Sequence, residues 1–182
     1  MTRRITVSGL PGSGTSTLCR RLSERTGLEH VNAGRIFRDL AGELGLSLAE
    51  LGRRAEADGE IDRRLDERMI ERARAGGCVL EGRVTGWMMH RRQLAALRVW
   101  VEAGLDTRAR RVAGRDRQPI AEATTAILER ERSERQRYAV HYRIDLSDLS
   151  IYDLVVGSAR SDAEALCGRV EGMMEAMAKG RA

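Results

Sequence analysis

A glycine-rich segment near the start of the chain has the residue types and the spacing that bind phosphate. It runs Gly-Leu-Pro-Gly-Ser-Gly-Thr-Ser over residues 9–16. Glycines at this spacing let backbone N–H groups turn inward around an anion. Ser16 stands where a hydroxyl can reach Mg²⁺. The position before it, lysine in a standard phosphate-binding loop, is Thr15. We therefore expect a loop that holds a polyphosphate without the usual mobile cation.

The segments on either side of this loop supply the context that phosphate binding requires. An apolar strand is expected over residues 3–8, and a helix over 14–26 with Leu18 and Leu22 on its apolar face. The helix directs the positive end of its dipole at the loop, which adds to the attraction for an anion. A plain glycine turn is the alternative. The agreement of glycines, hydroxyls and flanking elements favours phosphate.

Residues that follow later strands suit a second anion. Arg83 leaves a buried strand over 78–80 directly after Gly82, and Arg38 lies on an otherwise apolar helix. Planar guanidinium groups grip phosphate oxygens in pairs, so both arginines fit a phosphate ligand. Glu81 is an acid at the end of the buried strand over 78–80. It can hold Mg²⁺, directly or through water, or satisfy nearby backbone N–H groups, and the sequence leaves both open.

Two arginine clusters lie further along the chain. The first follows a helix over about 105–113 into a loop-like segment over 114–119, and the second lies on a long charged helix over 121–141. The members are Arg108, Arg111 and Arg115 in the first cluster and Arg130, Arg132, Arg135 and Arg137 in the second. The acids Glu129, Glu131 and Glu134 interleave with the second cluster. A solvent-exposed face held by salt bridges is therefore the default expectation for most of it.

The elements that must position these residues alternate between strand and helix. Strands are expected over residues 3–8, 28–32, 78–80, 97–101 and 152–156. Helices are expected between them, including one over 48–57 capped by Ser47, and a last one begins after Ser161 or Asp162. This alternation predicts a parallel five-stranded sheet with helices on both faces, a three-layer α/β/α fold. Because ligands of such sheets bind beyond the carboxyl ends of the strands, the glycine loop, Arg38 and Arg83 should converge.

Composition narrows the class of protein. A chain of 182 residues fits one domain, and its 3% aromatic content predicts an aliphatic core. The net charge of +5 suits a polyanionic ligand, but basic and acidic residues interleave and stacking aromatics are scarce, which argues against nucleic acid. Neither a membrane-spanning run nor a signal peptide stands out. The three cysteines predict reduced core thiols of a cytoplasmic protein, and the three histidines show no metal-ligand spacing.

Several segments in a fixed order resemble the cytidylate kinase family, in its short archaeal-type form. They are the glycine loop, Ala33-Gly34-x-x-Phe37-Arg38, Val79 to Arg83, the arginine-rich segment over 108–137, and the segment over 148–156. The resemblance covers nearly the whole chain. It implies a nucleoside-monophosphate kinase of the phosphate-binding-loop class, with one domain over residues 1–182. Within it, about 33–75 would be the insertion that binds the monophosphate, and about 111–137 the lid region.

The resemblance also implies a role for individual residues. The donor ATP would be bound by Gly9, Leu10, Pro11, Gly12, Ser13, Gly14, Thr15, Ser16, Thr17, Arg111 and Arg115. The acceptor, CMP or dCMP, would be bound by Ala33, Gly34, Arg38, Gly82 and Arg83. Ser16 and Glu81 would hold Mg²⁺, and Ser158 to Arg160 would line the adenine end. Arg83, Arg132 and Arg137 would act on the transferring group. The partners would be these nucleotides alone, without nucleic acid or membrane, and the protein would work as a monomer.

Two departures from the family pattern leave questions open. Family members similar to this chain can carry threonine in the lysine slot, and we hypothesise that Arg83 or a lid arginine supplies the missing charge. Val84 stands where bacterial relatives have an aspartate that helps to recognise cytosine. The acceptor could therefore be AMP, UMP or a shikimate-like alcohol, and a low-turnover nucleotide-binding regulator is a further alternative. Phosphoryl transfer itself needs two anions in line, charge neutralisation and exclusion of water.

Overall fold

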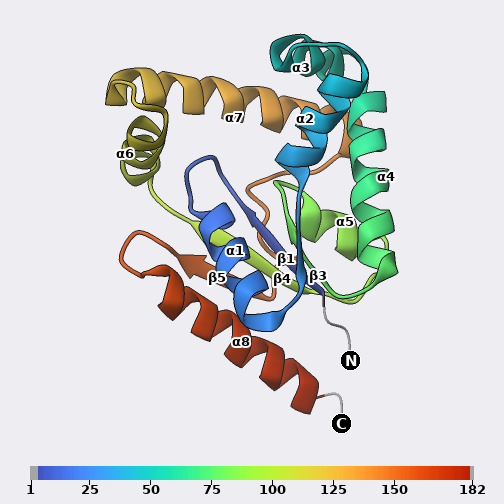
Figure 1. Ribbon diagram of the computed structural model, residues 1–182, viewed down its shortest axis with the longest axis vertical. Coiled ribbons are helices and arrows are strands. Elements are labelled where there is room, and N and C mark those ends of the chain that lie inside the picture. The colour runs from blue at the N-terminus through green and yellow to red at the C-terminus, as the bar shows by residue number, and fades with distance from the viewer. Residues whose placement is uncertain (1–3, 181–182) are drawn as a thin grey trace.

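The computed structural model describes residues 4–180 and has a parallel sheet at its centre (Figure 1). The strands are β1 (Arg4–Gly9), β2 (Glu29–Asn32), β3 (Cys78–Glu81), β4 (Leu97–Glu102) and β5 (Leu154–Gly157). Their order across the sheet is β2-β3-β1-β4-β5, and every neighbouring pair is parallel. The predicted five-stranded parallel sheet is confirmed. β1 lies in the middle, so the loop after it opens at the centre of the carboxyl edge.

Helices cover both faces of the sheet and complete the three predicted layers. They are α1 (Thr15–Thr26), α2 (Ala33–Glu43), α3 (Leu48–Ala57), α4 (Glu60–Ala75), α5 (Thr85–Arg91), α6 (Leu105–Asp116), α7 (Ile120–Tyr142) and α8 (Ala163–Lys179). Successive side chains of a strand point to opposite faces. In β3, Val79 packs with α1 and α8, whereas Leu80 packs with α4, α5 and α7. Two buried apolar clusters therefore lie on the two sides of one sheet.

Two helical units with cores of their own stand above the carboxyl edge of the sheet. The α2–α4 unit packs around Leu40, Leu51 and Ile61, and the α6–α7 unit packs around Val112 and Ile127. Figure 1 shows α7 running from α6 on one side of the molecule to α2 and α3 on the other. Within the described range, no helix is both long and apolar enough to cross a lipid bilayer.

Local signals account for several helix ends. Gly27 ends α1 in the left-handed conformation with φ of 69°. Ser47 and Glu50 form the expected reciprocal capping box of α3. Asp162, rather than Ser161, caps α8 by accepting a hydrogen bond from the backbone N–H of Ala165.

Two elements differ from the prediction by more than one residue. Helix α6 continues through Gly114 to Asp116, so the predicted loop over 114–119 shrinks to residues 117–119. A helix tolerates an internal glycine at a cost of about 1 kcal/mol, and Pro119 sets the start of α7 rather than lengthening the loop. Strand β5 starts at Leu154 instead of 152, because the Tyr152 N–H donates to the Leu149 carbonyl at 3.0 Å and closes a turn before the strand.

Candidate active site

The glycine loop connects β1 to α1 in a conformation that its glycines make possible. Gly12 and Gly14 have φ of 81° and 98°, the left-handed region that side chains with Cβ rarely adopt. A Cβ on Gly9 would lie 2.7 Å from the Val101 carbonyl oxygen, so that position is also closed to larger residues. The Ser13 N–H donates to the Leu10 carbonyl at 3.0 Å and closes the turn. The predicted phosphate-binding architecture of strand, tight glycine loop and helix is present.

The carboxylate of Glu81, at the end of β3, accepts hydrogen bonds from four side chains beside this loop. Oε1 accepts from the Thr15 hydroxyl at 3.0 Å and from the Ser16 hydroxyl at 2.5 Å. Oε2 pairs with His30 Nε2 at 2.9 Å and accepts from the Asn32 amide. These partners are side chains, not the backbone N–H groups that the sequence left as one possibility. Thr15, the residue in the lysine slot, is therefore directed at an acid.

This network determines the charge of Glu81. Burial by itself would raise the pKa of the carboxyl, but the hydrogen bonds from His30, Ser16 and Thr15 outweigh burial, and the pKa of Glu81 is lowered. Glu81 is therefore an anion at neutral pH. Ser16 Oγ and the ionised Glu81 are adjacent oxygen donors of the kind that Mg²⁺ prefers, so both residues predicted as metal ligands fit the ion.

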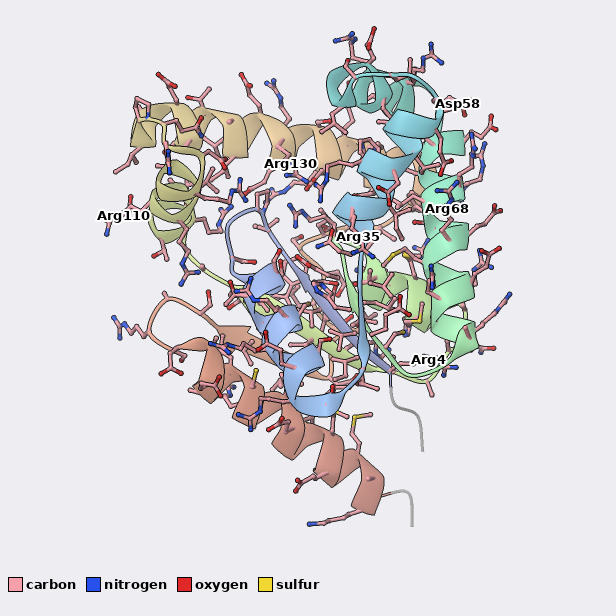
Figure 2. All side chains as sticks on the ribbon, in the orientation of Figure 1. Arg4, Arg35, Asp58, Arg68, Arg110 and Arg130 are labelled. Carbon is pink, nitrogen blue, oxygen red and sulfur yellow. The ribbon has the colours of Figure 1, made fainter. Side chains whose placement is uncertain are left out.

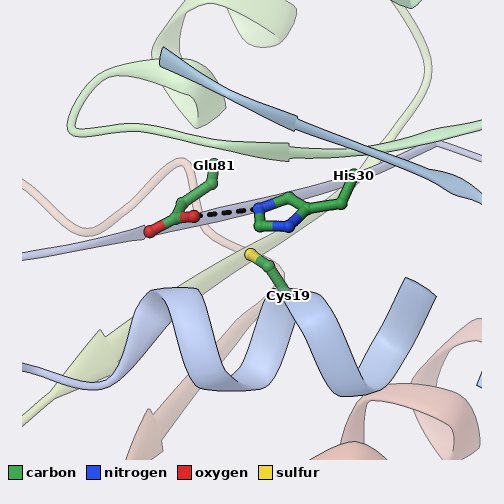
Figure 3. Close-up of side chains that lie close together, drawn as sticks. All are labelled: Cys19, His30 and Glu81. Carbon is green, nitrogen blue, oxygen red and sulfur yellow. Dashed lines mark hydrogen bonds and ion pairs between the residues drawn. The ribbon is translucent and has the colours of Figure 1, made fainter. Parts of the chain in front are cut away.

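A nitrogen and a sulfur atom lie close to the same carboxylate. The ligand atoms of Cys19, His30 and Glu81 lie within 4.8 Å of one another (Figure 3). The chain positions of the histidines could not reveal this cluster because its members come from α1, β2 and β3. Burial raises the pKa of Cys19 well above its ordinary value, so the thiol stays protonated and is a poor metal ligand. The cluster therefore supports a hard cation at its oxygen side.

Arg83 lies between the start of the glycine loop and an acid on α7. Its Nη1 donates to the Gly9 carbonyl at 2.5 Å, and its Nε donates to Glu134 Oε2 at 2.6 Å. Glu134 also accepts from Arg130 Nε at 2.8 Å. Burial would raise the pKa of Glu134, but the charges of Arg83 and Arg130 and their hydrogen bonds lower it. The ionised Glu134 holds two guanidinium groups near the loop.

Two arginines of α6 contact the loop from its other sides. Arg111 Nη1 donates to the Ser13 carbonyl at 3.2 Å and to the Ser158 hydroxyl at 2.9 Å. The sequence places Arg108 in the same cluster as Arg111, but Arg108 is buried behind the loop. It donates to the Pro11 carbonyl at 3.2 Å and pairs with the buried Glu131. Arg108 supports the backbone of the loop instead of opening onto the ligand.

A cleft of about 800 Å³ extends from the glycine loop to α2, α3 and α7. The predicted site residues on its walls are Leu10, Pro11, Gly12, Thr15, Ser16, Ala33, Gly34, Arg38, Glu81, Gly82, Arg83, Arg115 and Arg137. The other predicted residues are not on these walls: Gly9, Ser13 and Gly14 within the loop, Thr17 on α1, Arg111 beside the loop, and Arg132. One continuous cleft therefore joins the predicted donor and acceptor residues.

Helix α7 differs most from the expected solvent-exposed face. Glu131 and Glu134 are only 7% and 6% exposed, so the prediction of a salt-bridged surface was wrong for both. They continue the buried stripe of Ala123, Ile127 and Tyr138 at spacings of three and four, a helical period that predicts an inward face. The helical spacing of three and four residues, applied to the acids as well as to the apolar residues, could have identified Glu131 and Glu134 as inward-facing.

The arginines of α7 are divided between two sides of the helix. Arg130 and Arg137 line the cleft, whereas Arg132 is exposed and lines only an adjoining hollow, which shares Glu56, Ser133 and Arg137 with the cleft. Figure 2 shows Arg130 on the side of α7 that faces the glycine loop. Arg137 Nε lies 2.9 Å from the buried Asp62 carboxylate of α4. This placement favours Arg130 and Arg137 over Arg132 as groups that can reach a ligand.

The fold and the loop define a kinase of the phosphate-binding-loop class. Solved structures of that class share the fold. Shikimate kinase from Bacteroides thetaiotaomicron matches with a TM-score of 0.64 and 14% sequence identity, over 94% of this chain and 98% of its own. A gluconokinase from Sinorhizobium meliloti matches with a TM-score of 0.64 and 13% sequence identity, over 98% of this chain and 95% of its own. The particular family follows from the sequence. Residues 4–160 match the model of the cytidylate kinase-like family, and the chain belongs to that family.

Relatives agree with this assignment over most of their length. The chain is 46% identical to the cytidylate kinase of Pyrococcus horikoshii over 94% of this chain and 88% of the relative. It is 51% identical to the cytidylate kinase of Thermococcus sibiricus over 85% of this chain and 78% of the relative. It is 41% identical to the cytidylate kinase of Methanocaldococcus jannaschii over 96% of this chain and 99% of the relative. The resemblance to the short archaeal-type form is therefore confirmed at the level of the family.

Proposed function

We propose that the protein transfers the terminal phosphoryl group of ATP to CMP or dCMP and forms the diphosphate. The observation that carries this proposal is the single cleft that joins the glycine loop to the arginines of α2, β3 and α7. A kinase of this kind needs two polyanions brought into line, and the cleft offers cations on both sides of the loop. The relatives of the chain that carry the name cytidylate kinase support the choice of acceptor.

The donor half is built from the loop and the start of α1. Backbone N–H groups of residues 9–16 and the positive end of the α1 dipole attract the phosphates of ATP. Ser16 and Glu81 would hold Mg²⁺, which neutralises charge on the donor phosphates. Arg111 and Ser158 are linked by a hydrogen bond of 2.9 Å at the far side of the loop, a placement that suits the nucleoside end of the donor.

The acceptor half requires cations that reach the transferring group. Arg83 is already held at the loop by Gly9 and Glu134, which supports the hypothesis that it supplies the charge missing at Thr15. Arg38 lies on α2 at the acceptor side, and Arg137 approaches from α7. The reaction needs no strong general base, because the acceptor oxygen is anionic. Positioning and charge neutralisation are what these arginines contribute.

The α2–α4 unit and the α6–α7 unit would act as movable walls of this site. The predicted monophosphate-binding insertion at 33–75 corresponds to α2–α4, and the predicted lid at 111–137 to the α6–α7 corner. Each packs on its own small core, which supports closure of each as a rigid unit that excludes water. We further propose that the protein acts as a monomer in the cytoplasm. The three cysteines are free and buried, which fits a reducing compartment.

An ADP-release assay with ATP, Mg²⁺ and a panel of acceptors tests the proposal. The panel contains CMP, dCMP, UMP, AMP and shikimate. We expect turnover with CMP and dCMP well above that with the other three. Higher turnover with AMP, UMP or shikimate would replace the acceptor, and no ADP above background with any acceptor would favour a nucleotide-binding regulator.

A further inference from the structure

A carboxylate and a hydroxyl meet across the end of the cleft that lies away from the glycine loop. The carboxylate of Glu56 on α3 accepts a hydrogen bond from the hydroxyl of Ser133 on α7. Both residues line the cleft, at the point where it meets the adjoining hollow. On α3, Leu48, Gly52 and Glu56 lie at spacings of four and present one face of the helix to the same space. The pair was not among the residues that the sequence indicated.

Glu56 differs from the other acids of the cleft in having neither an ion pair nor a network of several donors. Glu81 accepts from four side chains, Asp116 pairs with Arg115 at 2.7 Å, and Glu134 pairs with two arginines. Among residues 4–180, no arginine, lysine or histidine forms an ion pair with Glu56. Glu56 is exposed and accepts one hydrogen bond, from the Ser133 hydroxyl, so its carboxylate can accept further hydrogen bonds from a ligand.

The walls around this pair suit a flat heterocycle. Phe37 from α2, Leu48 from α3 and Leu65 from α4 provide apolar surface on the same cleft. Gly52 has no side chain, and a Cβ built there would meet nothing within 4 Å, so room remains beside α3. Val84, at the position where the sequence leaves recognition of the base open, is 6% exposed and apolar. It therefore offers the base no polar atom.

The donors and acceptors of the pair are complementary to one pyrimidine. Cytosine presents an amino group at N4, which donates, next to the ring nitrogen N3, which accepts. A carboxylate can only accept, and a hydroxyl can donate. Uracil presents an oxygen at the place of the amino group and an N–H at N3. A carboxylate opposite that oxygen would place two acceptors together, a mismatch that costs affinity.

We propose that Glu56 and Ser133 determine the base specificity of the acceptor site. Glu56 accepts a hydrogen bond from the N4 amino group of the cytosine, and the Ser133 hydroxyl turns from Glu56 to donate to N3. The proposal rests on the proposed function, because it assigns the base recognition of that acceptor. It selects a cytosine nucleotide over a uracil nucleotide through contacts with the base alone, so the sugar and phosphate contacts are shared by both.

The variant Glu56→Gln tests this assignment. An amide offers both a donor and an acceptor, so it can face either base. We expect the ratio of kcat/KM for CMP to kcat/KM for UMP to fall about 10- to 100-fold, the range expected for a hydrogen bond to a charged group. The KM for ATP should stay unchanged. Glu129→Gln is the matched control, because Glu129 on α7 lines the neighbouring hollow but not the cleft, and the same charge is removed.

A second measurement separates this proposal from the proposed function. Equilibrium binding of CMP and of UMP to the wild-type protein and to both variants, without ATP, does not depend on turnover. If the wild-type protein binds CMP in preference to UMP and Glu56→Gln abolishes this preference, the proposal is supported. That holds even when no ADP is formed, because the absence of ADP argues only against the kinase activity. An equal loss of affinity for both nucleotides, or an unchanged ratio, overturns the assignment, since Glu56 would then only bridge α3 and α7.

Discussion

The Arg83 guanidinium donates its Nε–H to the buried carboxylate of Glu134, with 2.6 Å between Nε and Oε2. The two side chains are 13% and 8% exposed, so the pair is largely shielded from water. Removing one partner of such a pair leaves an uncompensated charge, whereas the intact pair fixes the orientation of the arginine. The other end of the same guanidinium reaches the carbonyl of Gly9, where the glycine loop begins. The loop and α7 are therefore connected through one arginine.

Replacing Arg83 tests whether this connection supplies the charge that a lysine supplies elsewhere. We expect Arg83→Met to lower kcat by about 10³-fold, the effect of losing an arginine that stabilises the transferring group. ATP binding should change much less, because the loop N–H groups remain. Arg135→Met serves as the control, since Arg135 lies on α7 with 59% of its side chain exposed. Comparable losses in kcat and in ATP affinity would contradict the assigned role.

The variant Thr15→Lys tests the converse, whether a lysine restored to the loop strengthens the binding of ATP. In the wild-type protein the Thr15 hydroxyl donates to Glu81 at 3.0 Å. A lysine at this position would extend a cation toward the donor phosphates, and we expect the Kd for ATP to fall about 10-fold through charge-assisted hydrogen bonds. Titration calorimetry with ATP and Mg²⁺ measures this change. Thr15→Val is the partner variant and should weaken the Glu81 network without gaining affinity. Unchanged binding by the lysine variant would show that the slot no longer faces the phosphates.

Local signals were sufficient for much of the fold and for the loop. The order of glycines and hydroxyls at 9–16, the alternation of strands and helices, and the capping pair Ser47 and Glu50 all depend on residues close together in the chain. They predicted the parallel sheet, the phosphate-binding loop and several helix ends. Such features follow from short-range physics, so one sequence suffices to recognise them.

Contacts between distant segments could not be predicted in the same way. His30 and Asn32 meet Glu81 only because β2 pairs with β3, and Glu56 meets Ser133 only because α3 packs on α7. Chain position likewise gave no indication that Arg130 lines the cleft and Arg132 does not. Pairing and packing decide these contacts.

The variants Arg137→Ala and Arg132→Ala compare two arginines to which the family resemblance assigns the same role at the transferring group. Arg137 lines both the cleft and the adjoining hollow with 12% of its side chain exposed, whereas Arg132 lines only the hollow. We expect Arg137→Ala to lower kcat by about 10³-fold and Arg132→Ala to have a small effect on kcat. Steady-state assays with saturating ATP measure both.

Stability must be followed in the same experiment, because Arg137 pairs with the buried Asp62. Removing the arginine leaves that acid unpaired, at a cost of about 3 kcal/mol in the free energy of unfolding. Urea denaturation of Arg137→Ala with and without Asp62→Asn identifies this part of the effect. If the double variant regains both stability and kcat, Arg137 is structural. A large loss of kcat in Arg132→Ala would assign the role at the transferring group to Arg132, as the family resemblance implies.

The stability of the protein should depend on pH through Asp66 of α4. Burial raises the pKa of Asp66 to about 6, with a further contribution from the charge of Asp62. The ordinary value in an unfolded chain is about 3.9, so between these values the folded protein binds more protons than the unfolded one. The stabilisation is therefore present below about pH 4 and is lost as the pH rises through about 6. At pH 8 the half-buried carboxylate is charged and destabilising.

Asp66→Asn removes this charge, and we expect the variant to be about 1–2 kcal/mol more stable than the wild-type protein at pH 8, with the difference vanishing near pH 4. Urea denaturation across this pH range measures the free energy of unfolding of both. Glu67→Gln, which removes an exposed carboxylate from the same helix, is the control and should follow the wild-type curve. A difference that stays constant with pH would mean that the asparagine acts through packing, because only a titrating group can change the slope.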